Sequence, residues 1–312
     1  MSTVKLRGIS TVVLDIEGTL CPIWFVARVL YPYATSNLRK VVTSQWNEEA
    51  FQPYKAAFPD DVRDAPESVI SHCQALAAKD IKDPAWKKLQ GLIWRQGYAD
   101  GVLAVPLFGD VTPRLKAWRQ DGYLLAIFSS GSVEAQKLFF RYIDPNADLS
   151  QSKGESDDDN VLEGASAKTE GRAGEALTAG DKQMASEVTK EGAASAKKSW
   201  ADPELAAEAA GKSQKQVQTQ DLSGLFDANF DTVNAGSKVV AESYTKIVKE
   251  LGKDAGECLF LSDNVKEIAA AKEAGLHAIL VDRPGNAALS EEDRRNFDVV
   301  ESLDMVELTK RP

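Results

Sequence analysis

The sequence predicts an α/β protein with a doubly wound, mainly parallel sheet, a small helical cap domain and a long disordered insertion. Short apolar strands alternate with amphipathic helical stretches over residues 1–24 and 104–312, which is typical of such a sheet. Residues 25–103 have helical periodicity and no strand pattern, and residues 150–221 have few large apolar side chains. We therefore expect a core over 1–24 and 104–312, a cap over 25–103 and an insertion over 150–221.

The first core strand is predicted within residues 11–19, TVVLDIEGT. Its apolar residues interleave with Asp15 and Glu17, and Gly18 then lets the chain leave the sheet. Asp15 would thus lie at the carboxyl end of a strand, where open α/β sheets bind ligands. A buried carboxylate there needs a positive partner, and Mg²⁺ suits oxygen ligands. From this stretch alone, an ordinary turn with solvated carboxylates is the alternative.

The composition limits the possible partners. The 312 residues are 43% hydrophobic and 27% charged, and the net charge of −10 disfavours binding to nucleic acid or to an anionic membrane. We expect neither partner, no signal peptide and no membrane-spanning segment. The three cysteines, Cys21, Cys73 and Cys258, are widely spaced and odd in number, which argues against disulfides or a zinc site and for a reducing intracellular compartment.

Helices and strands alternate along the rest of the chain. Cap helices are predicted over residues 36–46, 66–79 and 83–96, the last with Asp83 as its N-cap and Pro84 at its first position. The predicted core elements that follow are a helix ending at Gly122, a strand over 124–128, a helix over 133–142, a short strand over 226–232, a helix with Val240, Tyr244, Ile247, Val248 and Leu251 on one face, a strand over 258–261, a helix ending at Gly275, a last strand over 277–281 and one further helix after Ser290.

The predicted insertion differs sharply in composition from its flanks. Residues 151–220 contain only eight large apolar residues among 70. So little apolar surface cannot offset the entropy lost on ordering, which predicts a disordered surface loop without a recognisable function.

Polar residues of the types needed for phosphoryl transfer follow several of the predicted strands. Parallel strands direct their carboxyl ends to one edge of a sheet, so these residues should converge. A lysine before a helix is by itself more typical of a solvated position, and a glutamate one turn into a helix is as often exposed. The residues are Asp15 and Glu17, Ser129 and Ser130, Lys238, Asp263 and Glu267.

Four motifs, in order, resemble the haloacid dehalogenase superfamily of phosphohydrolases: DIEGT, FSSG, GSK and LSDNVKE. Longer stretches are similar to the enolase-phosphatase E1 family of methionine salvage, namely DIEGTLCPIWFV, LQGLIWRQGYADG, IFSSGSVEAQKLFF, GSKVVAESYTKI, LFLSD and VDRPGN. Glu17, where the superfamily usually has aspartate, is typical of this family. The chain departs from the family in its long insertion and at Leu20, where a second threonine is usual.

The resemblance implies roles for these residues. Asp15 is the nucleophile that forms an aspartyl phosphate, and Glu17 is a candidate acid and base. One Mg²⁺ per subunit is held by Asp15, Asp263 and the backbone carbonyl of Glu17. The substrate is bound by Ser129, Ser130 and Lys238. Ser129 acts together with backbone amides at the start of a helix, and Lys238 acts through its charge.

The implied reaction converts 2,3-diketo-5-methylthiopentyl 1-phosphate into 1,2-dihydroxy-3-keto-5-methylthiopentene and phosphate, through an enol phosphate. The group that removes the proton is left open between Glu17 and a cap residue. Cap aromatics either cover the methylthio end or only pack: Trp24, Phe25, Trp94 and Tyr98. Similar eukaryotic proteins imply the cytoplasm with some protein in the nucleus, and we expect a monomer. The alternatives are a phosphatase of another small phosphorylated metabolite and a catalytically silent interaction protein.

Overall fold

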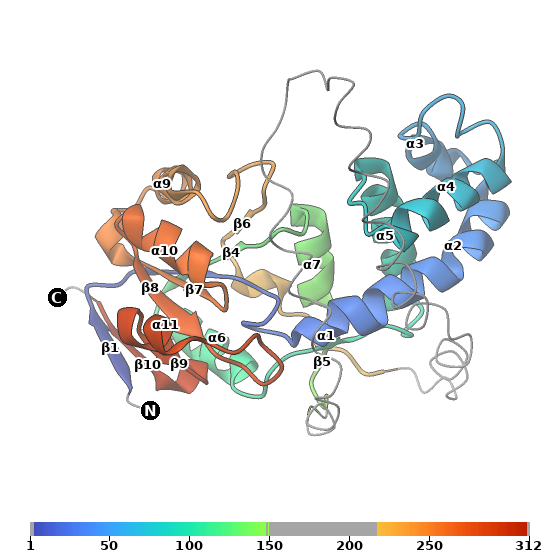
Figure 1. Ribbon diagram of the computed structural model, residues 1–312. Coiled ribbons are helices and arrows are strands. Elements are labelled where there is room, and N and C mark those ends of the chain that lie inside the picture. Colours follow the sequence, from blue (N-terminus) through green and yellow to red (C-terminus); the bar gives the residue numbers. More distant parts are fainter. Residues whose placement is uncertain (1–2, 148, 150–216, 311–312) are drawn as a thin grey trace, which may run out of the picture.

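The computed structural model describes residues 3–147, 149 and 217–310. Its centre is a six-stranded sheet in the order β6-β4-β2-β7-β8-β9, in which every neighbouring pair is parallel (Figure 1). This confirms the predicted parallel sheet. The strands are β2 (Thr11–Leu14), β4 (Leu124–Phe128), β6 (Ala228–Phe230), β7 (Cys258–Ser262), β8 (His277–Val281) and β9 (Val299–Val300).

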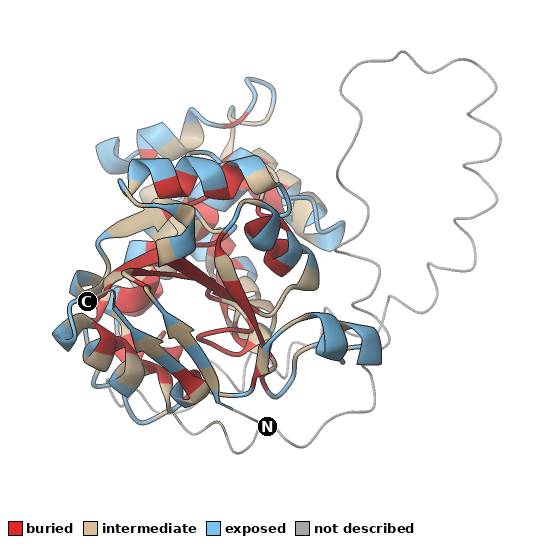
Figure 2. Cartoon of the chain, turned by 90° about the vertical axis from the view of Figure 1, so that its left-hand side faces the viewer, coloured by how far each residue is buried: buried red, intermediate tan, exposed pale blue. Residues whose placement is uncertain are grey.

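Helices cover both faces of the sheet, as a doubly wound fold requires. Val12 and Leu14 of β2 pack into one apolar cluster with residues of α6 and α7, whereas Val13 packs into another with residues of α9 and α10. Successive side chains of a strand point to opposite faces, so buried strands are apolar throughout. Figure 2 shows the buried strands at the centre of the core. The helices are α6 (Val111–Gln120), α7 (Val133–Arg141), α9 (Ala241–Glu250) and α10 (Val265–Glu273).

The cap helices from α2 to α5 pack on one another around a separate apolar cluster, whereas the buried residues of α1 and η1, Phe25 and Leu30, belong to a cluster of the core. In Figure 1 they lie together to one side of the sheet, and the described residues 25–103 contain no strand. Asp83 accepts a hydrogen bond from the Trp86 amide at 2.9 Å, which confirms the predicted N-cap. Arg95 pairs with Glu134 of α7 and so links the cap to the core. The cap elements are α1 (Ile23–Phe25), the π-helical segment η1 (Val26–Leu30), α2 (Tyr31–Gln45), η2 (Glu49–Phe51), α3 (Gln52–Lys55), α4 (Pro66–Ala78) and α5 (Pro84–Ala99).

The prediction was wrong at both ends of the core. The strand over 277–281 is not the last one, because β9 pairs with it and β10 (Val306–Thr309) pairs in parallel with β1 (Val4–Arg7). The single helix expected after Ser290 is only α11 (Glu291–Asn296). The buried residues Val300, Leu303 and Val306 are spaced by three, which imitates a helical face.

Four further boundaries differ from the prediction. The first cap helix starts at α1, well before residue 36, and the strand predicted over 226–232 is only the three residues of β6. Val240 precedes α9 and is 38% exposed, so it is not part of the buried face. The amides and carbonyls of Ile143 and Gln220 exchange two hydrogen bonds, so Gln220 belongs to the core although it lies within the predicted insertion. The rest of the predicted insertion, residues 150–216, lies outside the described residues.

The remaining short elements connect these layers. No helix among the described residues is both long and apolar enough to span a membrane. The short elements are β3 (Val105–Pro106), β5 (Ile143–Asp144), η6 (Ser223–Leu225), η7 (Ala255–Glu257) and η8 (Leu303–Met305).

Candidate active site

Asp15 follows β2 directly, and its amide donates to the carbonyl of Leu261 in the neighbouring strand β7 at 2.9 Å. Its side chain meets Lys238, whose Nζ lies 2.5 Å from Asp15 Oδ1. The two residues are only 5% and 8% exposed. The predicted meeting of the strand-end carboxylate with the distant lysine is therefore present in the structure.

Lys238 lies in the loop before α9 rather than at the first residue of that helix. The hydroxyl of Tyr244 donates to the Lys238 carbonyl at 2.6 Å, and the Tyr244 ring packs edge-on against Phe128 and Phe260. Tyr244 is thus the core residue that the sequence predicted, and it also fixes the backbone of the lysine. Burial alone would lower the pKa of Lys238, but the carboxylates of Asp15 and Glu267 raise it above its usual value, so the amine is charged.

Glu267 lies on α10, and the sequence left open whether it belongs to the site or is exposed. It is buried, its Oε2 lies 2.7 Å from Lys238 Nζ, and it accepts a hydrogen bond from Ser262 Oγ at 2.8 Å. Burial and the charge of Asp15 raise its pKa, although Lys238 opposes the shift. Lys238 is therefore held between two carboxylates that come from opposite ends of the chain.

Asp263 packs against the turn that follows Asp15. Gly18 has a φ of +74°, and a Cβ placed on it would lie 2.4 Å from Asp263 Oδ2. Only glycine allows both this backbone conformation and this approach of the carboxylate. Burial, followed by the charges of Asp15 and Glu267, raises the pKa of Asp263. The acidic residue after β7 thus lies beside the first loop, as predicted.

Glu17 is partly exposed, and its backbone forms a bridge with that of Cys21. Loss of solvent around its carboxyl and the nearby charge of Asp15 raise its pKa to about 7, against the opposing charges of Lys238 and Lys82. Lys82 comes from the loop between α4 and α5, so the cap contributes positive charge to this side of the site. A carboxyl with such a pKa can both give and take a proton near neutral pH.

Ser129 and Ser130 follow β4, the strand on the other side of β2. Leu14 is in register with Ile127 of β4 and with Leu261 of β7, so the residues after these three strands share one edge of the sheet. Ser129 is buried, and its Oγ accepts a hydrogen bond from the Gly131 amide at 3.4 Å, whereas Ser130 is exposed. Amides at the start of α7 follow directly, which is the arrangement expected of an anion site.

The donor set fits Mg²⁺ through two carboxylates and one carbonyl. No three His, Cys, Asp or Glu side chains within the described ranges form a metal-binding cluster. Mg²⁺, however, commonly binds through one or two carboxylates and keeps several waters. Asp15 and Asp263 supply the carboxylates and the backbone of Glu17 a carbonyl. Burial and the neighbouring carboxylates raise the pKa values of Asp263 and Glu267, and a divalent cation beside them would favour their charged forms.

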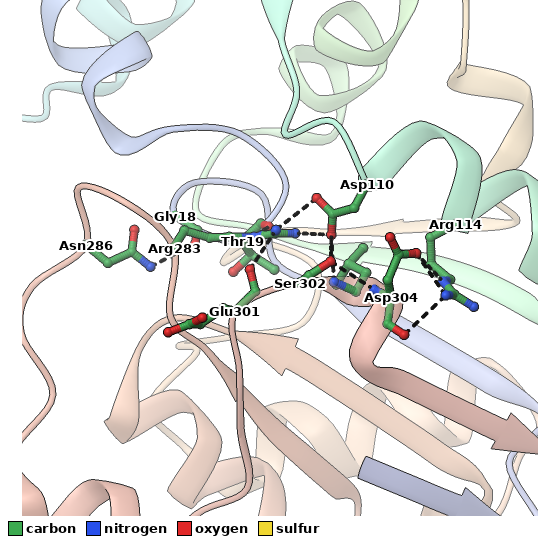
Figure 3. Close-up of polar contacts among 10 residues, drawn as sticks. Gly18, Thr19, Asp110, Arg114, Arg283, Asn286, Glu301, Ser302 and Asp304 are labelled. Atoms are coloured by element: carbon green, nitrogen blue, oxygen red, sulfur yellow. Dashed lines mark hydrogen bonds and ion pairs between the residues drawn. The ribbon is translucent and has the colours of Figure 1, made fainter. Parts of the chain in front are cut away.

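Sequence reasoning gave no role to Arg283, Asp110 and Asn286, which Figure 3 places against the first loop. Arg283 Nε donates to the carbonyl of Thr19, and Asn286 Nδ2 donates to that of Gly18. The only sequence signal for Arg283 and Asn286 was the stretch VDRPGN after β8, which carried the resemblance without a function, and Asp110 had no such signal.

The four cap aromatics all make packing or hydrogen-bond contacts within the protein. Phe25 and Tyr98 are buried, and Trp94 Nε1 donates to the Leu30 carbonyl at 2.7 Å. Trp24 packs edge-on against Phe25.

Comparison with known proteins places the chain in a family. A model described as haloacid dehalogenase-like hydrolase matches residues 186–275. Enolase-phosphatase E1 of Botryotinia fuckeliana is 37% identical over 96% of this chain and 94% of the relative, and that of Neurospora crassa is 38% identical over 96% and 99%. The chain belongs to the enolase-phosphatase E1 family. The crystal structure of the UTR4 protein of Saccharomyces cerevisiae resembles this enolase-phosphatase family member with a TM-score of 0.66 and 29% identity, over 95% of this chain and 99% of that one.

Proposed function

We propose that the chain is a Mg²⁺-dependent, bifunctional enolase-phosphatase that converts 2,3-diketo-5-methylthiopentyl 1-phosphate into 1,2-dihydroxy-3-keto-5-methylthiopentene and phosphate in methionine salvage. The observation that carries this proposal is the contact between Lys238 and Asp15 at the carboxyl edge of the sheet, in a chain of this family. The buried lysine places a positive charge against the aspartate and provides positive charge for a phosphate oxygen.

The phosphatase half uses the two carboxylates of the first loop. Asp15 attacks the phosphorus, the bond to the substrate oxygen breaks, and an aspartyl phosphate forms. Glu17 protonates the leaving oxygen and then takes a proton from the water that hydrolyses the aspartyl phosphate, a double role that its pKa of about 7 suits. Mg²⁺, when held by Asp15, Asp263 and the Glu17 carbonyl, supplies positive charge against the phosphoryl group.

The enolase half requires removal of a proton next to a carbonyl. The raised pKa of Glu17 makes its carboxylate a stronger base than an ordinary glutamate, which supports Glu17 over a cap residue for this step. Ser129 and the amides before α7, with Ser130 at the exposed edge, orient the phosphate. Lys82 is the cap residue whose charge reaches Glu17, and it is the natural alternative to test.

We also propose the organisation around this activity. The cap of residues 25–103 closes over the edge of the core formed by residues 1–24 and 104–312, and the insertion is passive. The protein acts as a monomer on a small phosphorylated diketone, without nucleic acid or membrane. It works in the cytoplasm, with some protein in the nucleus.

The test is incubation with the diketone phosphate and Mg²⁺, following enol formation by absorbance and phosphate release by a colorimetric assay. The intact chain should give both signals, and Asp15→Asn should release no phosphate. The exposed cap variant Asp61→Asn is the matched control and should behave as the intact chain does. Turnover of common sugar phosphates without turnover of the diketone would instead favour a phosphatase of another small metabolite.

A further inference from the structure

The segment after β8 donates two hydrogen bonds to backbone carbonyls of the first loop, one from Arg283 and one from Asn286. The Arg283 guanidinium donates to both carboxylate oxygens of Asp110 at 2.9 Å and lies over the Phe108 ring (Figure 3). Held in this way, it donates from Nε to the Thr19 carbonyl at 3.1 Å. The arginine is itself buried, Thr19 is buried and Asp110 is half-buried, and a third bond goes to the Glu301 carbonyl at 3.0 Å, so Arg283 is a rigid support for the residue after Gly18.

Asn286 holds the preceding carbonyl. Its Nδ2 donates to Gly18 O at 2.9 Å and to Val281 O at 3.2 Å. Both partners are acceptors, so the amide cannot be reversed without turning its oxygen towards two carbonyl oxygens. The orientation of the side chain is therefore fixed, and Oδ1 must point away from these carbonyls.

The oxygen of this amide faces the proposed metal ligand. Asn286 Oδ1 is buried and accepts no hydrogen bond from the part of the chain that the structure describes. A Cβ placed on Gly18 would lie 3.2 Å from Asn286 Oδ1 and 2.4 Å from Asp263 Oδ2, so both oxygens approach the same side of Gly18. A buried acceptor without a donor is unfavourable, which indicates that a donor binds there in the working protein.

We propose that Asn286 is a positioning residue for the divalent cation. Its Nδ2 fixes the turn at Gly18, and its Oδ1 accepts a hydrogen bond from a water on the ion that Asp15 and Asp263 hold. Mg²⁺ keeps several of its waters, and their polarised hydrogens seek acceptors of this kind. This inference rests on the proposed function, because it assumes a Mg²⁺ site between these two aspartates.

The experiment is a calorimetric titration with Mg²⁺ alone, without substrate, on the full chain. Asn286→Ala removes the donor and the acceptor, and it should weaken Mg²⁺ binding by about 10-fold or more. Asn286→Asp also loses the donor to the Gly18 and Val281 carbonyls, but it keeps an oxygen on the Asp263 side and should bind Mg²⁺ more tightly than Asn286→Ala. If Asn286→Ala does not fold, Asn286→Ser takes its place, because its shorter hydroxyl cannot reach both sides. The control is Asn37→Ala, which loses a 3.0 Å bond to the Tyr33 carbonyl in the cap and should keep full affinity.

The outcomes separate this proposal from the proposed function. Equal Mg²⁺ affinities of the intact chain and Asn286→Ala, both folded by circular dichroism, would overturn the role of Asn286 even if the diketone is turned over. Equally weak binding by Asn286→Ala and Asn286→Asp would also overturn it, because an oxygen on the Asp263 side would then not matter. Weaker binding by Asn286→Ala than by both the intact chain and Asn286→Asp supports it, and does so even if the intact chain acts on a different phosphate ester.

Discussion

Lys238 Nζ and Asp15 Oδ1 lie 2.5 Å apart, although 223 residues separate them along the chain. Both residues are buried, and the same amine contacts Glu267 at 2.7 Å. Buried charges stabilise the fold only when each has a counter-charge, so removal of one of these three groups leaves another uncompensated. The contact therefore couples the stability of the core to the chemistry of the site.

We expect Lys238→Met to unfold more easily and to lose phosphate release. The variant leaves Asp15 and Glu267 facing each other without a cation, which should lower the free energy of unfolding by about 3–5 kcal/mol. Urea titration followed by circular dichroism measures the loss. Lys246→Met, on the exposed face of α9, is the control and should change it by less than about 0.5 kcal/mol. Wild-type stability of Lys238→Met would show that the lysine is not the counter-charge of this cluster.

Glu17→Gln should lower activity while making the fold more stable. The substitution removes one carboxylate from a cluster in which Asp15 already disfavours a second negative charge. Without the acid and base, kcat should fall about 10²–10⁴-fold, while the free energy of unfolding rises by about 1 kcal/mol. Steady-state phosphate release and urea titration measure the two effects. A variant that keeps its kcat would refute the acid and base role of Glu17.

The sequence could predict those parts of the fold in which a local pattern determines the structure. The strands β4 and β8 have the predicted bounds, because a strand buried on both faces is apolar throughout. Asp15 and Asp263 could be placed at one edge because parallel strands end together. The tail could not be predicted, since β9 has two residues and exists only by pairing with β8. Its buried residues also follow a helical spacing.

The partners of the site residues were harder to predict than the residues themselves. Glu267 is buried because Lys238 reaches it, and no spacing within α10 signals that contact. Arg283 and Asp110 are 173 residues apart, and each is unremarkable in its own segment. Such pairs form where loops meet at the edge of the sheet. The spacing of residues within one segment does not reveal them.

The ion pair of Asp110 and Arg283 should make stability depend on acid pH. Burial alone would raise the pKa of Asp110, but the bonds and charge of Arg283, the Leu303 amide and the Ser302 hydroxyl lower it below its usual 3.8. The folded state therefore binds the proton less readily than the unfolded state. The stabilisation is fully present above the usual pKa and is lost as the pH falls through the folded value.

Asp110→Asn measures this contribution. At pH 7 it should lower the free energy of unfolding by about 3 kcal/mol, because Arg283 stays buried without its counter-charge. The difference from the intact chain should shrink below about pH 4, where the aspartate of the intact chain also takes up its proton. Urea titrations between pH 3 and pH 7, in steps of about one unit, give the curve. A difference that does not change with pH would contradict the ionic role of Asp110.

Gly18→Ala tests whether the first loop needs the close approach of Asp263 in addition to a left-handed backbone. Gly252 has a similar φ of +63°, but a Cβ there would meet nothing within 4 Å. Gly252→Ala should thus show only the backbone strain, about 1–2 kcal/mol in urea titration. Gly18→Ala should lose more and should also weaken Mg²⁺ binding in calorimetry, because its methyl group displaces the Asp263 carboxylate. Equal losses in the two variants, with unchanged Mg²⁺ affinity, would mean that Gly18 is required for its backbone alone.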